Sequence, residues 1–304
     1  MYSHPKSPHK YSLPQLLSCV LLKIYIKNIS FRDLEELLLS SEDMCRVLAL
    51  RAVPNYSTLS RAHSRVSDKQ IQLLVEKVLE VIFTHAKINS SMVFACDSTG
   101  FKEDSASFYY ALRSGKKRKR WIKATYLVDT KTQVCVSQVI STGPSGDSKG
   151  ICQLEHRTPL KAFIEVMDRG FDGKGNFRFA LPFRIIPPIR RGGSIKSWRR
   201  ILAYMVYLIS RWMGIYGKRW ICETMISVIK RKFGDSLRER KEQNKKKITS
   251  LMAIAYNIHV VVRAEGRISF FIIDFLYLQQ MNVCNKVIFY SKLKTKKSKA
   301  NCLL

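Results

Sequence analysis

Apolar residues recur at helical spacing through the first ninety residues of the chain. One such run extends from Ser12 to about Ile26, and a second follows as "SFRDLEELLLS". A third, "IQLLVEKVLEVIF", places its main apolar residues on one helical face: Ile71, Leu74, Val75, Val78 and Ile82. The pattern predicts a small all-helical domain over residues 1–89.

Polar residues mark where two of these helices begin. Ser30 is followed three positions later by Asp33, and Ser67 by Gln70, which is the spacing of a capping pair. In such a pair each side chain satisfies a backbone N–H that the first helical turn leaves without a partner. The sequence therefore predicts helix starts just after Ser30 and Ser67.

A short basic helix is expected between these runs, in "VPNYSTLSRAHSRV". Pro54 and Asn55 make a turn, and Ser57 is placed to cap the helix, which carries Arg61 and Arg65. A helix-turn-helix module presents its recognition helix to the major groove in this way, after a turn in a helical bundle. The alternative is an ordinary exposed helix with solvated arginines. The first domain is thus expected to be helix-turn-helix-like, with both arginines as candidate DNA-binding residues.

The periodicity changes after residue 89. The segments that fit strands are "SMVFACD", the two halves of "IKATYLVDTKTQVCVSQVIST", "FIEVMD" and "RIIPPI". Short helices are expected at "LKAF" and "GKGNFRFALPF", and longer ones from Ser194 to about Val262. Strands interleaved with helices predict an α/β domain with a mixed sheet over residues 90–266. Residues 267–304 are left as a C-terminal extension of unknown role.

Charge then narrows the class of partner. The 304 residues include 53 Lys and Arg against 23 Asp and Glu, a formal net charge of +30 that is spread over most of the chain. An excess of this size favours binding to a polyanion, most commonly nucleic acid. A ribosome-associated or merely basic protein is the alternative.

The cysteines and apolar stretches bear on the compartment. The eight cysteines are scattered, without a CxxC pair or a His at zinc-finger spacing, which is typical of reduced thiols in the cytosol. The N-terminus lacks an apolar signal core, and the late stretch "ISFFIIDFLYL" is too short to span a bilayer and contains Asp274. We expect a cytoplasmic, nucleoid-associated protein with neither export nor a membrane span.

Two predicted strands end in an acidic residue. Asp97 follows "MVFAC" and Asp168 follows "FIEVM". Ligands and catalytic groups collect at the carboxyl edge of open α/β sheets, so both positions are candidates for a site. A single Asp after a strand also serves as a turn residue or a helix cap.

An isolated acid, Glu223, lies in a basic neighbourhood near the C-terminal helices. Tyr216, Arg219, Glu223 and Lys230 are separated by 3, 4 and 7 residues, and at about 100° per residue they share one side of a helix. A phenol, a guanidinium, a carboxylate and an ammonium suit a surface where metal and phosphate meet, and do not suit a core. Arg219 and Lys230 could hold phosphates, while Glu223 could complete a metal site begun by the two aspartates.

This Tyr-x2-Arg-x3-Glu-x6-Lys spacing resembles the pattern around the catalytic glutamate of DDE transposases from bacterial and archaeal insertion sequences of families four and five. Further segments resemble that family in the family's order: "VPNYSTLSR", "FACDSTGF", "RWIKATYLVDTKT", "MDRGFD" and "AYNIH". The resemblance covers roughly residues 12–262. It implies a ribonuclease-H-like fold.

The resemblance also implies a chemistry. Asp97, Asp168 and Glu223 are expected to bind two divalent ions, Mg²⁺ or Mn²⁺, that serve in-line attack on a phosphodiester. The implied partner is double-stranded DNA, both the terminal inverted repeats and the target, with a homodimer assembled on it. No glycine-rich phosphate loop is present, so no nucleotide cofactor is expected.

Two assignments require a choice. Asp172 lies four residues beyond Asp168, and its place before "GKGNF" favours a helix cap, so the metal is assigned to Asp168. "KKRKR", comprising Lys116, Lys117, Arg118, Lys119 and Arg120, precedes a strand and is expected to contact the DNA backbone. A solvated loop, or a chance likeness to a nuclear-localisation signal, is the alternative for this run.

Three hypotheses for function remain. The first is a transposase that cuts and joins DNA at the ends of its insertion sequence. A nuclease of the same fold that cleaves without joining is the second. A decayed, inactive transposase that acts only as a sequence-specific DNA-binding protein is the third.

Overall fold

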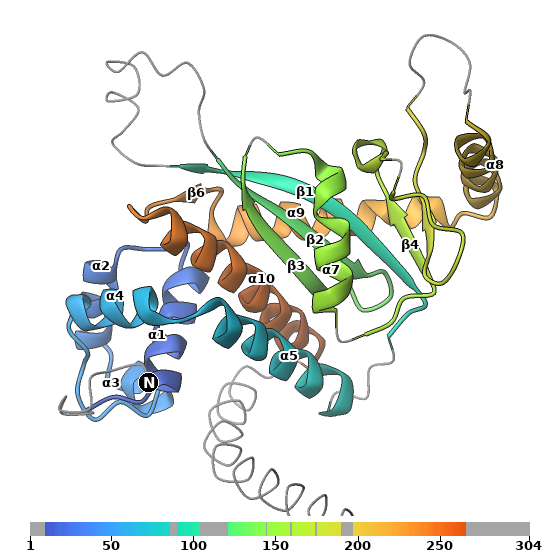
Figure 1. Ribbon diagram of the computed structural model, residues 1–304. Helices are drawn as coiled ribbons and strands as arrows, with labels where there is room; N and C mark the ends of the chain where they lie inside the picture. The colour runs from blue at the N-terminus through green and yellow to red at the C-terminus, as the bar shows by residue number, and fades with distance from the viewer. Residues whose placement is uncertain are drawn as a thin grey trace, which may run out of the picture.

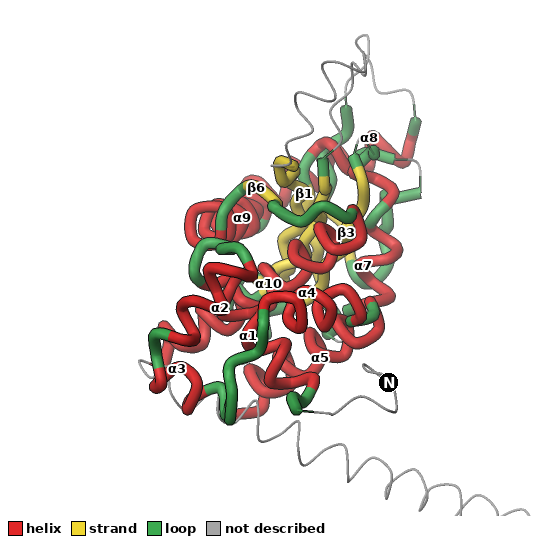
Figure 2. The backbone as a smooth tube through the Cα atoms, turned by 90° about the vertical axis from the view of Figure 1, so that its left-hand side faces the viewer, coloured by secondary structure: helices red, strands yellow, loops and turns green. Residues whose placement is uncertain are grey.

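The computed structural model describes residues 10–85, 90–103, 121–143, 145–158, 160–173, 175–189 and 197–265. A sheet crosses the middle of the molecule, with α7 on one face and α9 behind it on the other (Figure 1). Turned by 90°, the tube shows the first helices and α8 at opposite ends of the sheet (Figure 2). The basic run at residues 116–120 and the extension at 267–304 lie outside the described residues.

The predicted caps begin the helices of the first segment. The pair Ser30 and Asp33 forms a capping box at the start of α2 (Phe31–Leu39). Ser67 and Gln70 exchange the same hydrogen bonds ahead of α5 (Asp68–His85). A further capping box opens α1 (Leu13–Tyr25). Local sequence chemistry therefore sets where these helices start.

Two details of this segment differ from expectation. A short helix, α3 (Glu42–Val47), was not predicted. The basic helix α4 (Tyr56–Arg65) is capped by Asn55 and not by Ser57, because the Asn55 carboxamide accepts a hydrogen bond from the Ser57 backbone N–H at 3.0 Å. Asparagine is as good a cap as serine, so the helix starts one residue ahead of the expected cap.

The predicted mixed sheet is confirmed. Its strands are β1 (Val93–Glu103), β2 (Ile122–Asp129), β3 (Cys135–Thr142), β4 (Ile164–Met167), β5 (Phe183–Ile185) and β6 (Ser236–Leu237). The order is β3-β2-β1-β4-β5, with β6 pairing β1. β2 pairs antiparallel with β1 and β3, whereas β4 is parallel to both β1 and β5. The three leading strands form a meander, β4 and β6 pair with β1, and β5 pairs with β4.

The prediction of two short helices around β4 is wrong. The helix of this region, α7 (Ile151–Arg157), lies ahead of "LKAF", and a single 3₁₀ turn, η2 (Arg169–Phe171), follows β4. The described part of "GKGNFRFALPF" has no helix. Glycines weaken a helix there, and the Asn176 side chain instead donates to the carbonyls of Ser148 and Phe171, which fixes an irregular loop.

Helices dominate the last part, as expected. They are α8 (Trp198–Trp212), the 3₁₀ helix η3 (Tyr216–Arg219), α9 (Trp220–Phe233) and α10 (Glu242–Glu265). None of the described helices is both long and apolar enough to span a membrane. Asn257 of α10 accepts from the Cys135 N–H and donates to the Cys135 carbonyl, at 2.8 Å each, so α10 is fixed to β3.

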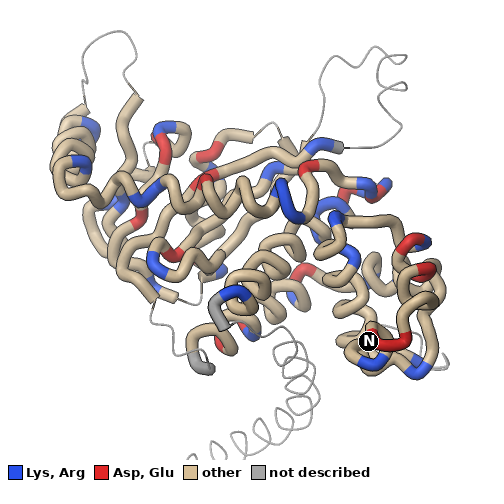
Figure 3. Tube along the Cα trace, turned by 180° about the vertical axis from the view of Figure 1, so that it is seen from behind, with Lys and Arg blue, Asp and Glu red and all other residues tan. Residues whose placement is uncertain are grey.

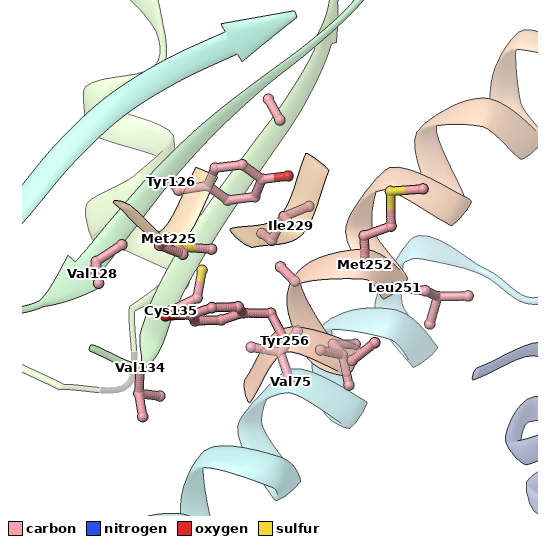
Figure 4. Close-up of a cluster of buried hydrophobic side chains, with 14 of the residues drawn as sticks. Val75, Tyr126, Val128, Val134, Cys135, Met225, Ile229, Leu251, Met252 and Tyr256 are labelled. Atoms are coloured by element: carbon pink, nitrogen blue, oxygen red, sulfur yellow. The ribbon is translucent and has the colours of Figure 1, made fainter. Parts of the chain in front are cut away.

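Strand alternation divides the core between the two faces of the sheet. On β1, Phe94 and Cys96 face α7, whereas Ala95 and Phe101 face the larger cluster that includes α9 and α10. Figure 4 shows part of the larger cluster, with side chains from sheet, α5, α9 and α10 packed together. Residues of α1 and α5 belong to this cluster too. The helical segment therefore shares a core with the sheet, and the boundary at residue 89 stays a prediction.

Candidate active site

The two candidate aspartates occupy neighbouring positions on adjacent strands. The parallel pairing of β1 with β4 ends at Cys96 and Met167, and the next residues are Asp97 and Asp168. Neighbouring strands lie about 4.8 Å apart, so this register sets the two acids side by side at the carboxyl end of β4. Two acids placed by backbone pairing alone form the base of a candidate site.

Asp97 does not end its strand, contrary to expectation. β1 continues six residues beyond it, to Glu103, and pairs with β2 as far as the Phe101–Ile122 pair. The continuation is stable because Phe101 is fully buried against α9 and its neighbours. Asp97 thus has a strand on only one side, and its other side is open where β4 has ended.

Alternation directs both aspartates toward the face that α9 covers. Asp97 lies an even number of positions from Ala95 and Phe101 on β1, so its side chain points to the same face as these members of the larger core cluster. Met167 faces α7, and Asp168, the next residue, points to the opposite face together with Val166 of the larger cluster. Both carboxylates therefore lie on the side of the sheet that α9 covers.

Glu223 lies in that part of α9, but not on one continuous helix with its predicted companions. Tyr216 and Arg219 belong to η3, and α9 begins at Trp220. The Arg219 guanidinium nevertheless contacts the Glu223 carboxylate at 2.5 Å across this junction. Lys230 lies two turns further along α9, with its ammonium 5.7 Å from the centre of the Phe101 ring.

Asp97 lies close enough to Glu223 and Asp168 for their negative charges to affect its pKa. The pKa of Asp97 is raised to about 6, chiefly by burial and to a smaller extent by the nearby Glu223 and Asp168, while the Ser98 N–H and Arg219 act in the opposite direction. Asp168 and Glu223 both raise the pKa of Arg219 through their negative charge. The site is therefore an anionic cluster that Arg219 offsets only in part.

The oxygen atoms of the three acids can be compared with the ligands that a divalent metal ion requires. Within the described ranges, no three His, Cys, Asp or Glu side chains gather closely enough to hold one ion. The three acids do supply hard oxygen donors, and Asp97 lies close enough to Glu223 and Asp168 for their charges to raise its pKa. Mg²⁺ binds through one or two carboxylates together with water and substrate phosphates, so a sparse oxygen set of this kind fits it.

Comparison with known proteins identifies the family. A family profile described as the transposase DDE domain matches residues 89–258, more than half of the chain. The chain belongs to the DDE transposase family. A search of curated proteins finds no match. Among solved structures, the cryo-EM structure of the piggyBac transposase synaptic complex with hairpin DNA is similar with a TM-score of 0.44 and 12% identity, covering 91% of this chain and 71% of that one.

The remaining acid of the transposase segment "MDRGFD" has another role. Asp172 was expected to cap a helix, and that expectation is wrong because no helix follows it among the described residues. Its carboxylate accepts from the Ile189 N–H at 2.7 Å and pairs with Arg200 of α8. The capping role falls to Asp168, which accepts from the Arg169 N–H at the start of η2. Asp168 is exposed, whereas the Asp172 side chain is fully buried.

Sequence reasoning missed a groove beside Asp97. A cavity of about 530 Å³ is lined by residues that include Ser98, Trp121, Lys123 and Asp147. Lys123 pairs with Asp147 at 2.5 Å, and the backbone of Gly170 lies close against that carboxylate. A lysine within the buried strand "IKATYLVD" was the available signal. Asp147 gave none, since it lies in the 3₁₀ helix η1 (Asp147–Lys149), distant from Asp97 in sequence.

The other predicted DNA-binding residues of the transposase lie apart from the acids. Arg61 and Arg65 are exposed on α4, in the helical segment. Lys and Arg positions are found on both the helices and the sheet-bearing part of the chain (Figure 3). The structure thus brings together Asp97, Asp168, Glu223, Tyr216 and Arg219, and leaves the arginines of α4 outside that group.

Proposed function

We propose that this DDE transposase cuts and joins DNA at the ends of an insertion sequence similar to those of families four and five. One observation carries the proposal: the β1–β4 register sets Asp97 and Asp168 side by side, facing the part of α9 that bears Glu223. The strand order, with three antiparallel strands followed by parallel ones, supports a ribonuclease-H-like fold.

The three acids would hold two divalent ions, Mg²⁺ or Mn²⁺. Bound ions supply activation of water or of a DNA 3′-hydroxyl, and they stabilise the leaving oxygen during in-line attack on the phosphodiester. Asp97 is the most buried of the three acids, so it would be the innermost ligand of a bound ion. Asp168 is exposed and accessible to an incoming strand.

The residues around the acids would bind the DNA phosphate. Arg219 now pairs with Glu223, so its guanidinium is freed for DNA when that carboxylate takes up a cation. Tyr216 packs edge-on against Tyr207, with ring centres 4.8 Å apart, which orients its hydroxyl group beside Arg219 and Asp168. Lys230 extends the positive surface along α9.

DNA binding beyond the active site is proposed for two further elements. Arg61 and Arg65 on the helix-turn-helix-like α4 are assigned to the terminal inverted repeats, and residues 116–120 to the DNA backbone. The proposed assembly is a homodimer on DNA in the cytoplasm, associated with the nucleoid. The proposed division is a DNA-binding domain at 1–89 and a catalytic domain at 90–266.

The test measures metal-dependent nicking at the element boundary. With Mg²⁺ or Mn²⁺ the protein should leave a 3′-hydroxyl, and Asp97→Asn, Asp168→Asn and Glu223→Gln should each abolish the reaction. Each substitution keeps the shape of the side chain and removes a charge that holds the ions together. Cleavage by all three variants at the parental rate would refute the metal site.

The same assay separates the other hypotheses. Cleavage without strand transfer would identify a nuclease of the same fold. Specific binding to the ends without any cleavage by the parent would identify a decayed transposase that acts as a DNA-binding protein.

A further inference from the structure

A second, strongly basic cavity lies away from the acids. Its volume is about 540 Å³, and it is bounded by α4, the start of α2, and the segment between α9 and α10. Six lining residues are basic: Lys23, Arg61, Arg65, Arg238, Arg240 and Lys241. The cavity has a single carboxylate, that of Glu239. Such an excess of positive charge around a concave site favours an anionic ligand.

Most of this charge is not neutralised by the protein. Within the described parts of the chain, Arg61, Arg238, Arg240 and Lys241 form no ion pair. Glu239 is engaged by Lys23 at 3.0 Å. Basic side chains that converge without acidic partners repel one another, and an anion between them relieves the repulsion.

A buried histidine gives an independent indication of a ligand. His63 of α4 lines the cavity and is only 1% exposed, yet both ring nitrogens lack a hydrogen-bond partner within the described structure. Its pKa is lowered to about 3, chiefly by burial and to a smaller extent by the charges of Lys23 and Lys247. The ring is therefore neutral, with one N–H donor. A buried donor without a partner is costly, which indicates an acceptor supplied from outside the chain.

The cavity also joins two parts of the fold. Asn244 and Lys247, on the first turns of α10, donate to the side chain and backbone carbonyl of Ser64 at 2.9 and 2.6 Å. Lys23 links α1 to Glu239 in the segment before α10. A ligand here contacts α4 from one side and residues 238–241 from the other.

We propose that this cavity binds a phosphate group, whose oxygens are held by Arg238 and Arg240 and accept a hydrogen bond from the His63 ring. The phosphate can come from the DNA backbone or from a free phosphate compound. The volume lies in the range of small-ligand pockets and accommodates one phosphodiester with its sugars. A DNA phosphate at this point fixes the position of α4 relative to the catalytic part, which deepens and rests on the proposed function.

The first experiment measures the salt dependence of binding to a DNA duplex, in EDTA so that no cleavage occurs. Between about 50 and 200 mM salt, Arg238→Ala/Arg240→Ala should make the negative slope of log K against log salt less steep by about 1, because a protein that neutralises one phosphate fewer releases fewer counterions. The matched control is Arg51→Ala/Lys69→Ala, which removes equal charge from exposed positions outside the cavity. Its slope should stay within about 0.5 of the parental value.

The second experiment substitutes the buried ring. His63→Phe should raise the unfolding temperature of the free protein, because a buried polar group without a partner is removed, and weaken DNA binding by about 10-fold. His63→Gln retains a donor and should bind more tightly than the Phe variant. A ring with a merely structural role would leave DNA affinity unchanged.

A third arm identifies the source of the phosphate. Inorganic phosphate at millimolar concentration should raise the unfolding temperature of the parent, but not of Arg238→Ala/Arg240→Ala, if a free compound is bound. A slope change without this stabilisation identifies the DNA backbone. Equal slopes for the two double variants, together with no stabilisation by phosphate, would overturn the proposal. Because no arm requires cleavage, an inactive protein still gives a result, and loss of nicking in Asp97→Asn is a separate outcome.

Discussion

Arg200 of α8 donates to both carboxylate oxygens of Asp172, at 2.8 and 2.9 Å. Both bonds come from the same nitrogen, Nη2, and they connect α8 to Asp172 through a carboxylate that is fully buried, so Asp172 has a structural role. Asp168, four residues earlier, is exposed beside Asp97. The two acids of "MDRGFD" therefore have separable roles.

Asp172→Asn should lower the free energy of unfolding by about 2 kcal/mol or more, because a buried pair is broken and Arg200 keeps no anionic partner. Nicking at a temperature where the variant is folded should remain near the parental rate. Urea denaturation and the boundary assay measure the two effects. Asp168→Asn should show the opposite pattern, near-parental stability without nicking. If Asp172→Asn abolished nicking while folded, the choice of second acid would be wrong.

The raised pKa of Asp97 predicts a pH-dependent stability difference in the absence of metal. Between pH 4 and about 6 the folded state binds more protons at Asp97 than the unfolded state does, so its contribution to stability falls as pH rises through this window. Asp97→Asn should therefore gain stability relative to the parent by about 1–2 kcal/mol across the window, and the difference should level off above it. Glu165, whose pKa is about 7, titrates in both proteins and cancels. A constant difference from pH 4 to 7 would contradict the prediction.

Arg219 pairs with Glu223, so a metal ion held by that carboxylate, as proposed, would compete with the guanidinium. Arg219→Ala should therefore lower the Mg²⁺ concentration that gives half-maximal thermal stabilisation, several-fold, while nicking becomes slower because the guanidinium no longer holds the phosphate. Lys218→Ala is the matched control, since Lys218 is exposed in the same turn. A higher Mg²⁺ requirement in Arg219→Ala would show that the guanidinium supports metal binding and does not oppose it.

The arginines of α4 and those of residues 238–241 should differ in what they recognise. Arg61→Ala/Arg65→Ala should reduce the preference for element ends over unrelated DNA, because side chains that read bases carry sequence information. Arg238→Ala/Arg240→Ala should weaken both DNAs alike. Competition binding with the two duplexes measures the ratio. An unchanged preference in the first variant would remove α4 from sequence recognition.

Much of the fold was predictable wherever the determining chemistry is local. The pairs Ser30–Asp33 and Ser67–Gln70 are recognisable from spacing because a cap involves only the first helical turn. The apolar face of α5 was also correct, since Val78 and Ile82 are fully buried. The β2–β3 hairpin follows from alternation around a polar turn.

The errors arose where distant residues decide the local structure. β1 extends past Asp97 because β2 and the core stabilise it, which a strand read in isolation does not reveal. The stripe from Tyr216 to Lys230 is interrupted at Trp220, where the 3₁₀ turn gives way to α9. The role of Asp172 depends on Arg200, 28 residues away. In the candidate site, residue types were predictable, but the register that makes Asp97 and Asp168 neighbours became known only from the sheet.

The Asn257 amide has a consequence for association. β3 lies at the end of the sheet order, and an edge strand exposes backbone groups that can pair with another chain. At Cys135 the Asn257 side chain supplies the acceptor and donor that a neighbouring strand would supply. The amide therefore blocks strand addition at this point of the edge. Copies of the protein therefore lose one route to aggregation by sheet extension.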